Sequence, residues 1–256
     1  GTNFLSKTVE KDGKTENVTN LQSTNPTDGS PEFTTLDILV NMAEYLIQDE
    51  KLKSKSNGKY DKEEEAKHIE EYTSIFSDFI DKMQKLECID QFLNTTDVKA
   101  SNFRIYNNKK VSGQHGQGNV LFRRVGQIAF AKTVGLCLKD GKDLDQIFKA
   151  IYKFEKKGGF SKLDNWDSIF YSVLYNPQKS RMIVSTSAIT LAAKLLKYVL
   201  FQNVTDEERE SLRQALIESR LLRTAGKVIN YDGNHLDCKT LEDDTFECEL
   251  KLPETV

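Results

Sequence analysis

The stretch from Val120 to Leu138 is apolar around almost its whole circumference when it is read as a helix. Its apolar positions include Leu121, Phe122, Val125, Ile128, Ala129, Phe130, Ala131, Val134, Leu136 and Leu138. A helix without a polar face has no side to turn to water, so it belongs at the centre of a fold. Gly126 and Gly135 each cost about 1 kcal/mol of helix stability relative to alanine, which predicts close approach of neighbouring helices.

Amphipathic segments on both sides supply the neighbours of this central helix. Apolar residues recur three and four positions apart in each of them, and capping pairs mark several starts. Three predicted helices begin at a capping pair: Thr34 with Asp37, ending at about 48; Asp143 with Gln146, ending at about 157; and Thr205 with Glu208, ending at about 223. Two more are predicted over 62–86 and 187–202. Leu163–Val173, which holds the only tryptophan, shows the same spacing.

The predicted fold class is therefore mainly α. We expect a single helical domain of six or seven helices around the central apolar helix, with irregular or short-strand segments at both ends. The boundaries are an irregular N-terminal arm over 1–33, the helical domain over 34–226, and a C-terminal tail over 227–256.

Short strands are expected in two places. Alternation of Phe103, Ile105 and Tyr106 predicts one before the central helix, and the turn signal Asp232-Gly233 with the alternating FECELKL predicts others in the tail.

Charge and hydropathy limit the classes of function. The net charge of −3 gives no whole-protein basic field to attract nucleic acid, although a local basic patch is compatible with it. No apolar run approaches the roughly 18 residues of a membrane span, and the N-terminal residues lack the apolar core of a signal peptide. We therefore predict a cytoplasmic protein that does not insert into a membrane.

The four cysteines are Cys88, Cys137, Cys238 and Cys248, and none is part of a C-x-x-C pair. Scattered cysteines in a chain of this size are typical of free thiols in a reducing compartment, and a disulfide between Cys238 and Cys248 is the alternative. The three histidines are also scattered, which argues against a structural zinc site. We expect no metal and no cofactor.

The loop before the central helix is the most site-like segment. His115 lies between Gly113 and Gly116, and Gly118 follows shortly after. Glycine-rich loops ahead of a helix can present backbone amides to a phosphate. The spacing matches neither the P-loop nor the dinucleotide-binding fingerprint. A flexible connection into a buried helix is the alternative interpretation.

Arg123 and Arg124 follow one turn later. Two adjacent arginines on an otherwise buried helix must reach a surface, an acidic partner or a ligand. Lys179 and Arg181, in the polar segment NPQKSR, could converge with them into a patch suited to phosphate. Plain solvation or salt bridging of the pair is the alternative.

Three segments, taken in order, resemble the C-terminal part of DGQHR-domain proteins, whose best-known members are the DndB-type proteins of bacterial DNA phosphorothioation systems. They are FTTLDILVNMAEYL, SGQHGQGNVLFRRVGQIAFA, and NWDSIFYSVLYNPQKSRMIVSTSAITLAAKLLKYVL followed by TDEERESL. The likeness extends over most of Thr2–Leu212. The Asp-Gly-Gln-His-Arg motif that names the family is absent, because Gly113-Gln114-His115-Gly116 lacks both its aspartate and its arginine.

The resemblance implies a bacterial DNA-associated accessory or regulatory protein, with DNA and other DNA-modification proteins as partners. Nucleic acid would then bind through Arg123, Arg124, Lys179 and Arg181, with His115 nearby. The resemblance implies no catalytic residues, and enzymatic activity is not expected of this segment alone. The alternatives are a helical subdomain of a ParB/sulfiredoxin-like nucleotide-hydrolysing enzyme and a protein-interaction scaffold, and the oligomeric state is left open.

Overall fold

The computed structural model describes residues 7–11, 14–20, 29–47, 62–95, 98–104, 118–242 and 245–254. Within these residues the protein is mainly helical, as the sequence predicts, with eight α-helices and only short pairs of strands. The helices are α1 (Leu36–Ile47), α3 (Lys62–Met83), α4 (Glu87–Asn94), α5 (Ala100–Phe103), α6 (Arg124–Lys139), α7 (Leu144–Lys156), α8 (Thr186–Phe201) and α9 (Asp206–Arg223), with the 3-10 turn η1 (Val120–Phe122) before α6.

The strands are two to four residues long and form five separate pairs. The pairs are β1 (Thr8–Lys11) with β2 (Lys14–Asn17), β3 (Thr19–Asn20) with β4 (Thr34–Thr35), β5 (Tyr175–Asn176) with β6 (Arg181–Met182), β7 (Val228–Ile229) with β8 (His235–Leu236), and β9 (Lys239–Thr240) with β10 (Phe246–Glu247). The β3–β4 pair is parallel and the others are antiparallel. The β3–β4 pair joins the N-terminal arm to the residues that precede α1.

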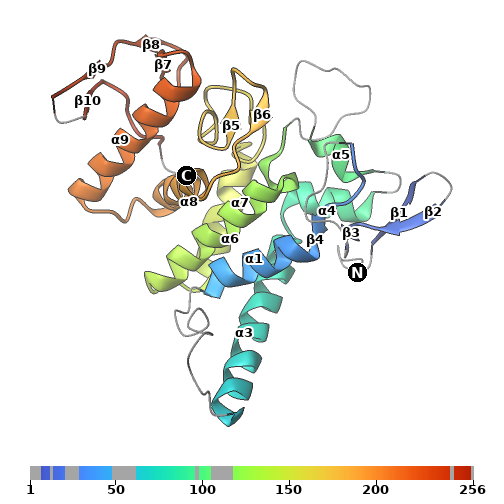
Figure 1. Ribbon diagram of the computed structural model, residues 1–256. Helices are drawn as coiled ribbons and strands as arrows, with labels where there is room; N and C mark the ends of the chain where they lie inside the picture. Colours follow the sequence, from blue (N-terminus) through green and yellow to red (C-terminus); the bar gives the residue numbers. More distant parts are fainter. Residues whose placement is uncertain are drawn as a thin grey trace.

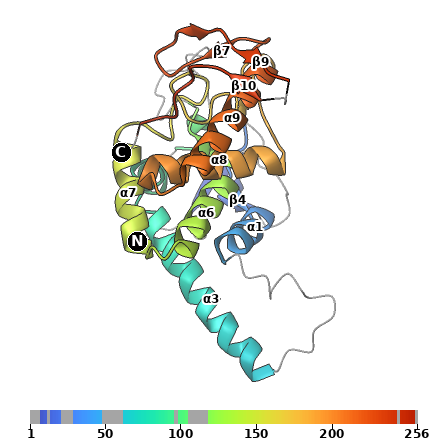
Figure 2. The same ribbon diagram turned by 90° about the vertical axis from the view of Figure 1, so that its left-hand side faces the viewer.

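Helix α6 is the central helix that the sequence predicts. It packs against α1 on one side and α8 on the other, and α7 crosses nearby (Figures 1 and 2). Most of its residues are buried, including the polar Gln127 and Thr133. The side chain of Gln127 is fully satisfied, because its amide nitrogen donates to the carbonyl oxygens of Phe33 and Leu121 and its oxygen accepts from Thr34.

The chain enters α6 through a sharp turn that the sequence does not reveal. Asn119 accepts a hydrogen bond from the backbone of Leu121 at 2.9 Å and starts η1, and the backbone at Arg123 is extended, so α6 begins at Arg124. A Cβ atom on Gly126 would lie 1.9 Å from the carbonyl oxygen of Val120. Close approach at Gly126 therefore comes from the preceding turn of the same chain.

The predicted helix caps are confirmed in two cases and wrong in one. Asp143 and Thr205 form the predicted capping boxes of α7 and α9, and Ser185 caps α8. The predicted cap at Thr34 is wrong. Thr35 accepts the hydrogen bond from the backbone of Ile38, because the Thr34 hydroxyl is directed inward to Gln127.

Two other local predictions are wrong where the described residues test them. Residues 163–173 form successive turns, whose hydrogen bonds repeat every three residues and so imitate helical spacing, and left-handed backbone at Lys162 and Ser172 bounds them. Phe103 ends the short helix α5 and stacks on Phe122 with ring centroids 4.1 Å apart. The other residues of that predicted strand, Ile105 and Tyr106, lie outside the described residues.

The C-terminal tail forms hairpins, as predicted, and covers α9. Pairing of β9 with β10 brings Cys238 and Cys248 together in a disulfide with 4.5 Å between their Cα atoms. The expectation of free thiols is therefore wrong for Cys238 and Cys248. The sequence could not show this, because the distance between the two cysteines is set by the pairing of β9 with β10. Cys88 and Cys137 are free, and burial raises the pKa of Cys137 to about 12. Disulfides are uncommon in the cytoplasm, and the cytoplasmic location stays a prediction.

None of the helices in the described part of the chain combines the length and the apolar character needed to cross a membrane.

Hydrogen bonds from Arg213 and Gln214 of α9 to backbone carbonyl oxygens of Cys248 and Phe246 fasten the tail to this helix. Arg213 donates to the carbonyl oxygen of Cys248 and to both carboxylate oxygens of Glu210, and Gln214 donates to Glu210 at 2.9 Å. The hydrogen bonds from Arg213 and Gln214 lower the pKa of Glu210 to about 2.

The depressed pKa of Glu210 predicts an acid-sensitive contribution to stability. Above pH about 4.5 the carboxylate is ionised in both folded and unfolded chains and the full contribution is present, and it is lost as the pH falls toward 2. The Glu210 side chain is 53% exposed, so we expect no more than about 1 kcal/mol. Unfolding curves of the protein and of Glu210→Gln between these pH values should converge at the acid end, and a constant difference would contradict the assignment.

Candidate functional site

Arg123, the first of the predicted phosphate contacts, is an internal residue. Its side chain is only 7% exposed, and one terminal nitrogen donates to the carbonyl oxygen of Arg104 at the end of α5. Arg123 therefore connects the segment before η1 to the start of α6 and is not directed at a ligand.

Arg124 forms a salt bridge with an acidic side chain, which is the alternative to phosphate binding that the sequence leaves open. Its guanidinium lies 2.9 Å from a carboxylate oxygen of Asp37, so the pair links the first turn of α6 to the first turn of α1. A carboxylate in the first turn of a helix is also favoured by the helix dipole. Arg124 thus holds two core helices together.

Lys179 and Arg181 lie elsewhere, on the exposed β5–β6 hairpin. Asn176 accepts a hydrogen bond from the backbone of Lys179 at 3.1 Å, and Ser180 has left-handed backbone, which shapes the tight turn. His115 lies outside the described residues. The structure thus puts two of the predicted residues in helix packing and two on a solvent-exposed turn.

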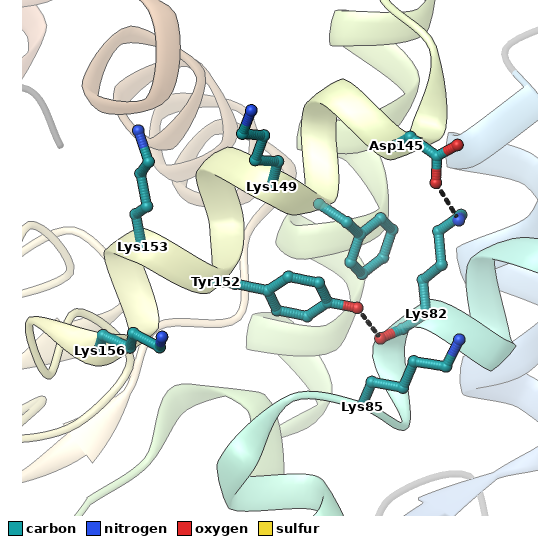
Figure 3. Close-up of a pocket in the computed structure, with 8 residues that line it drawn as sticks. Lys82, Lys85, Asp145, Lys149, Tyr152, Lys153 and Lys156 are labelled. Carbon is teal, nitrogen blue, oxygen red and sulfur yellow. Dashed lines mark hydrogen bonds and ion pairs between the residues drawn. The ribbon is translucent and has the colours of Figure 1, made fainter.

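A second basic surface gathers residues that the sequence left unassigned. Five lysines surround an open pocket of about 380 Å³ between the end of α3 and the outer face of α7 (Figure 3). These residues, called the lysine cluster below, are Lys82, Lys85, Lys149, Lys153 and Lys156.

The lysines of α7 share one side because of their spacing. Lys149, Lys153 and Lys156 are four and three residues apart, which aligns side chains on one face of a helix. The opposite face of α7 buries Ile147, Phe148, Ile151 and Phe154 in the core. Figure 3 shows the three lysines extending outward from α7.

The pocket is closed at one end by contacts between α3 and α7. Lys82 forms an ion pair with Asp145 at 2.5 Å, and the Tyr152 hydroxyl donates to the carbonyl oxygen of Lys82 at 2.9 Å. The hydrogen bond between the charged groups raises the pKa of Lys82 and lowers the pKa of Asp145. Both groups therefore stay charged in neutral solution.

The acidic side chains near α7 are already engaged. Asp145 pairs with Lys82, and the two carboxylate oxygens of Glu155 accept hydrogen bonds from the backbone nitrogens of Glu87 and Cys88 at the start of α4. In the described part of the chain no carboxylate forms an ion pair with Lys149, Lys153 or Lys156. The outer face of α7 is thus a row of positive charges without internal compensation.

Among the described residues, no group of histidine, cysteine and acidic side chains is arranged to hold a metal ion. Comparisons of the chain with protein-family models, with curated proteins and with solved structures found no match. Membership of the DGQHR-domain proteins therefore stays a prediction.

Proposed function

We propose that this protein is a DNA-associated accessory or regulatory protein, linked to bacterial DNA modification, which contacts the phosphate backbone of nucleic acid through its lysine cluster. The observation that carries the proposal is the uncompensated row Lys149, Lys153 and Lys156 on α7. The sequence resemblance to DGQHR-domain proteins supplies the link to DNA modification, and other proteins of such a system are the proposed partners.

The dimensions of the row suit a nucleic-acid strand. Lys149 and Lys156 are seven positions apart, or about 10 Å along the helix axis. Successive phosphates of one DNA strand are spaced about 3.4 Å along the duplex axis, so the row matches about three of them. Lysine acts as a mobile point charge on a flexible stem, which favours phosphate contacts that do not depend on base sequence.

Removing the row should weaken binding and its dependence on salt. We expect the triple substitution Lys149→Ala, Lys153→Ala and Lys156→Ala to raise the dissociation constant for a labelled DNA duplex about tenfold or more at moderate salt. Each lost phosphate contact lowers the slope of log affinity against log salt by about 0.9, so the slope should fall by about 3. Fluorescence anisotropy between about 50 and about 200 mM salt measures both quantities.

A matched control separates the row from a loss of net charge. Lys139, Lys227 and Lys251 are exposed lysines outside the cluster, and their triple alanine variant should retain most of the affinity and slope. A separate Lys179→Ala, Arg181→Ala variant tests the β5–β6 hairpin. Absence of binding by the unmodified protein, or equal losses in the cluster and control variants, contradicts the proposal.

A further inference from the structure

An aromatic ring lies in the middle of the lysine cluster. Tyr152 of α7 follows Lys149 by three residues and precedes Lys156 by four, which places the three side chains on one face of the helix. Tyr152 is partly exposed and lines the pocket of about 380 Å³ together with the five lysines. Figure 3 shows its ring extending from α7 toward the end of α3, with Lys149 drawn above it and Lys85 below it. The positive charges therefore surround an aromatic surface.

Two contacts hold this ring in place. The hydroxyl of Tyr152 donates to the carbonyl oxygen of Lys82 at 2.9 Å, and the buried Phe148 packs against the ring with 5.8 Å between the ring centroids. Burial raises the pKa of Tyr152, so the phenol is uncharged in neutral solution. Because its hydroxyl already has an acceptor, Tyr152 offers a ligand its ring. A side chain that is fixed before binding loses little conformational freedom when a ligand packs on it.

The charges around the ring favour a ligand that carries phosphate groups. Among the described residues that line the pocket, Asp145 is the one acid, and its carboxylate is paired with Lys82 at 2.5 Å. Lys85 and Lys149 are exposed, and they approach the pocket from α3 and from α7. Lysines on two sides of one ring can contact the phosphates on the two sides of one nucleotide.

A duplex cannot use this ring. Each base of a duplex is stacked between its neighbours, and its face reaches a protein only if the nucleotide is flipped out of the helix. The bases of a single strand are free to stack on an aromatic side chain, and proteins that bind single strands combine a positively charged groove with such rings. Tyr152 with the lysines around it has this combination.

We propose that this pocket binds single-stranded DNA, with one unstacked base on the ring of Tyr152 and the phosphates on either side of that base on the lysine cluster. The inference rests on the proposed nucleic-acid function and narrows it, because lysines alone contact single strands and duplexes alike. Tyr152 supplies the distinction between the two. Every base has an aromatic face, so the stacking contact does not depend on sequence.

Replacing Tyr152 by leucine removes the ring and keeps an apolar side chain. We expect Tyr152→Leu to raise the dissociation constant for a labelled oligothymidine about tenfold, through the loss of one stacked base, and to leave that for a duplex of equal length within about twofold. Fluorescence anisotropy at one fixed salt concentration measures both constants, and circular dichroism establishes that the variants are folded.

Two control variants accompany this substitution. Tyr152→Phe keeps the ring, so its dissociation constant for the oligothymidine should stay within about threefold of that of the unmodified protein. Trp166→Leu removes an aromatic side chain that is 45% exposed outside the lysine cluster, and it should change neither constant by more than about twofold.

A strand without bases separates stacking from charge. An abasic oligonucleotide keeps the phosphates, so the unmodified protein should bind it about tenfold more weakly than the oligothymidine, and Tyr152→Leu should not weaken it further. Equal affinity for the two strands, or a Tyr152→Leu variant that loses no affinity for the oligothymidine or loses as much for the duplex, overturns this inference. The proposed function then still stands on the triple lysine variant, whereas absence of binding to any of the three DNAs overturns both.

Discussion

Replacing Gly126 by alanine is expected to lower the free energy of unfolding by about 3 kcal/mol, although alanine is the better helix former by about 1 kcal/mol. The new Cβ atom would lie 1.9 Å from the carbonyl oxygen and 2.7 Å from the carbonyl carbon of Val120. These are backbone atoms, so no side-chain rotation relieves the overlap. Either η1 or the first turn of α6 must move.

Neither element can move cheaply. The backbone nitrogen of Val120 donates to the carbonyl oxygen of Phe160 at 2.8 Å, and Val120, Leu121 and Phe122 are all buried. For a chain of 256 residues the loss corresponds to a fall of roughly 6–12 °C in melting temperature. Gly29→Ala is the control, since a Cβ atom at that position would meet no other atom within 4 Å, and equal melting temperatures for both variants would contradict the prediction.

Local pattern predicts most of the helices because the signals for them are local. The apolar circumference of α6 and the capping pairs of Asp143 and Thr205 depend only on residues within a few positions of each other. The same reasoning fails over 163–173, where consecutive turns repeat every three residues and give apolar spacing close to that of a helix. In so short a segment, the period of the apolar residues alone cannot distinguish a helix from a run of turns.

The candidate site is less predictable because it depends on residues far apart in the sequence. The sequence shows that Arg123 and Arg124 need partners, but those partners are the carbonyl group of Arg104 and the carboxylate of Asp37. In the sequence, Lys149, Lys153 and Lys156 look like an ordinary solvated face of a helix. The site becomes visible only in the fold, where α3 packs beside α7 and places Lys82 next to Asp145. The spacing of the three lysines and the absence of acids between Lys149 and Lys153 were the only local signals.

The N-terminal arm is also fixed by residues that local pattern does not mark. Val18 and Phe33 are buried in the core, and the ammonium group of Lys7 donates to carbonyl oxygens at the end of α4, including those of Leu93 and Thr95. A basic side chain at a helix C-terminus satisfies carbonyl groups that have no partner within the helix. The arm therefore packs on the helices and contributes to their core.

Arg104 is the main link between that arm and the centre of the fold. Its side chain is 2% exposed and donates to the carbonyl oxygens of Phe122, Ser30 and Glu32, with a further bond to the Ser30 hydroxyl. The planar guanidinium reaches η1 on one side and the arm on the other. Lysine offers a single nitrogen and cannot serve both sides at once.

Replacing Arg104 by alanine is accordingly expected to cost about 3–5 kcal/mol of unfolding free energy, the largest effect predicted for this protein. The substitution leaves several buried carbonyl groups without donors and opens space beneath Phe122, and Arg104→Lys should recover only a minor part of the loss. Denaturant unfolding measures the cost, with the exposed Arg181→Ala expected within about 0.5 kcal/mol of the unmodified protein. Hydrogen exchange should also show faster exchange at the backbone nitrogens of Phe33 and Thr34, which donate to Val18. Unchanged exchange there, or a loss no greater than that of Arg181→Ala, would mean that Arg104 does not hold the arm to the core.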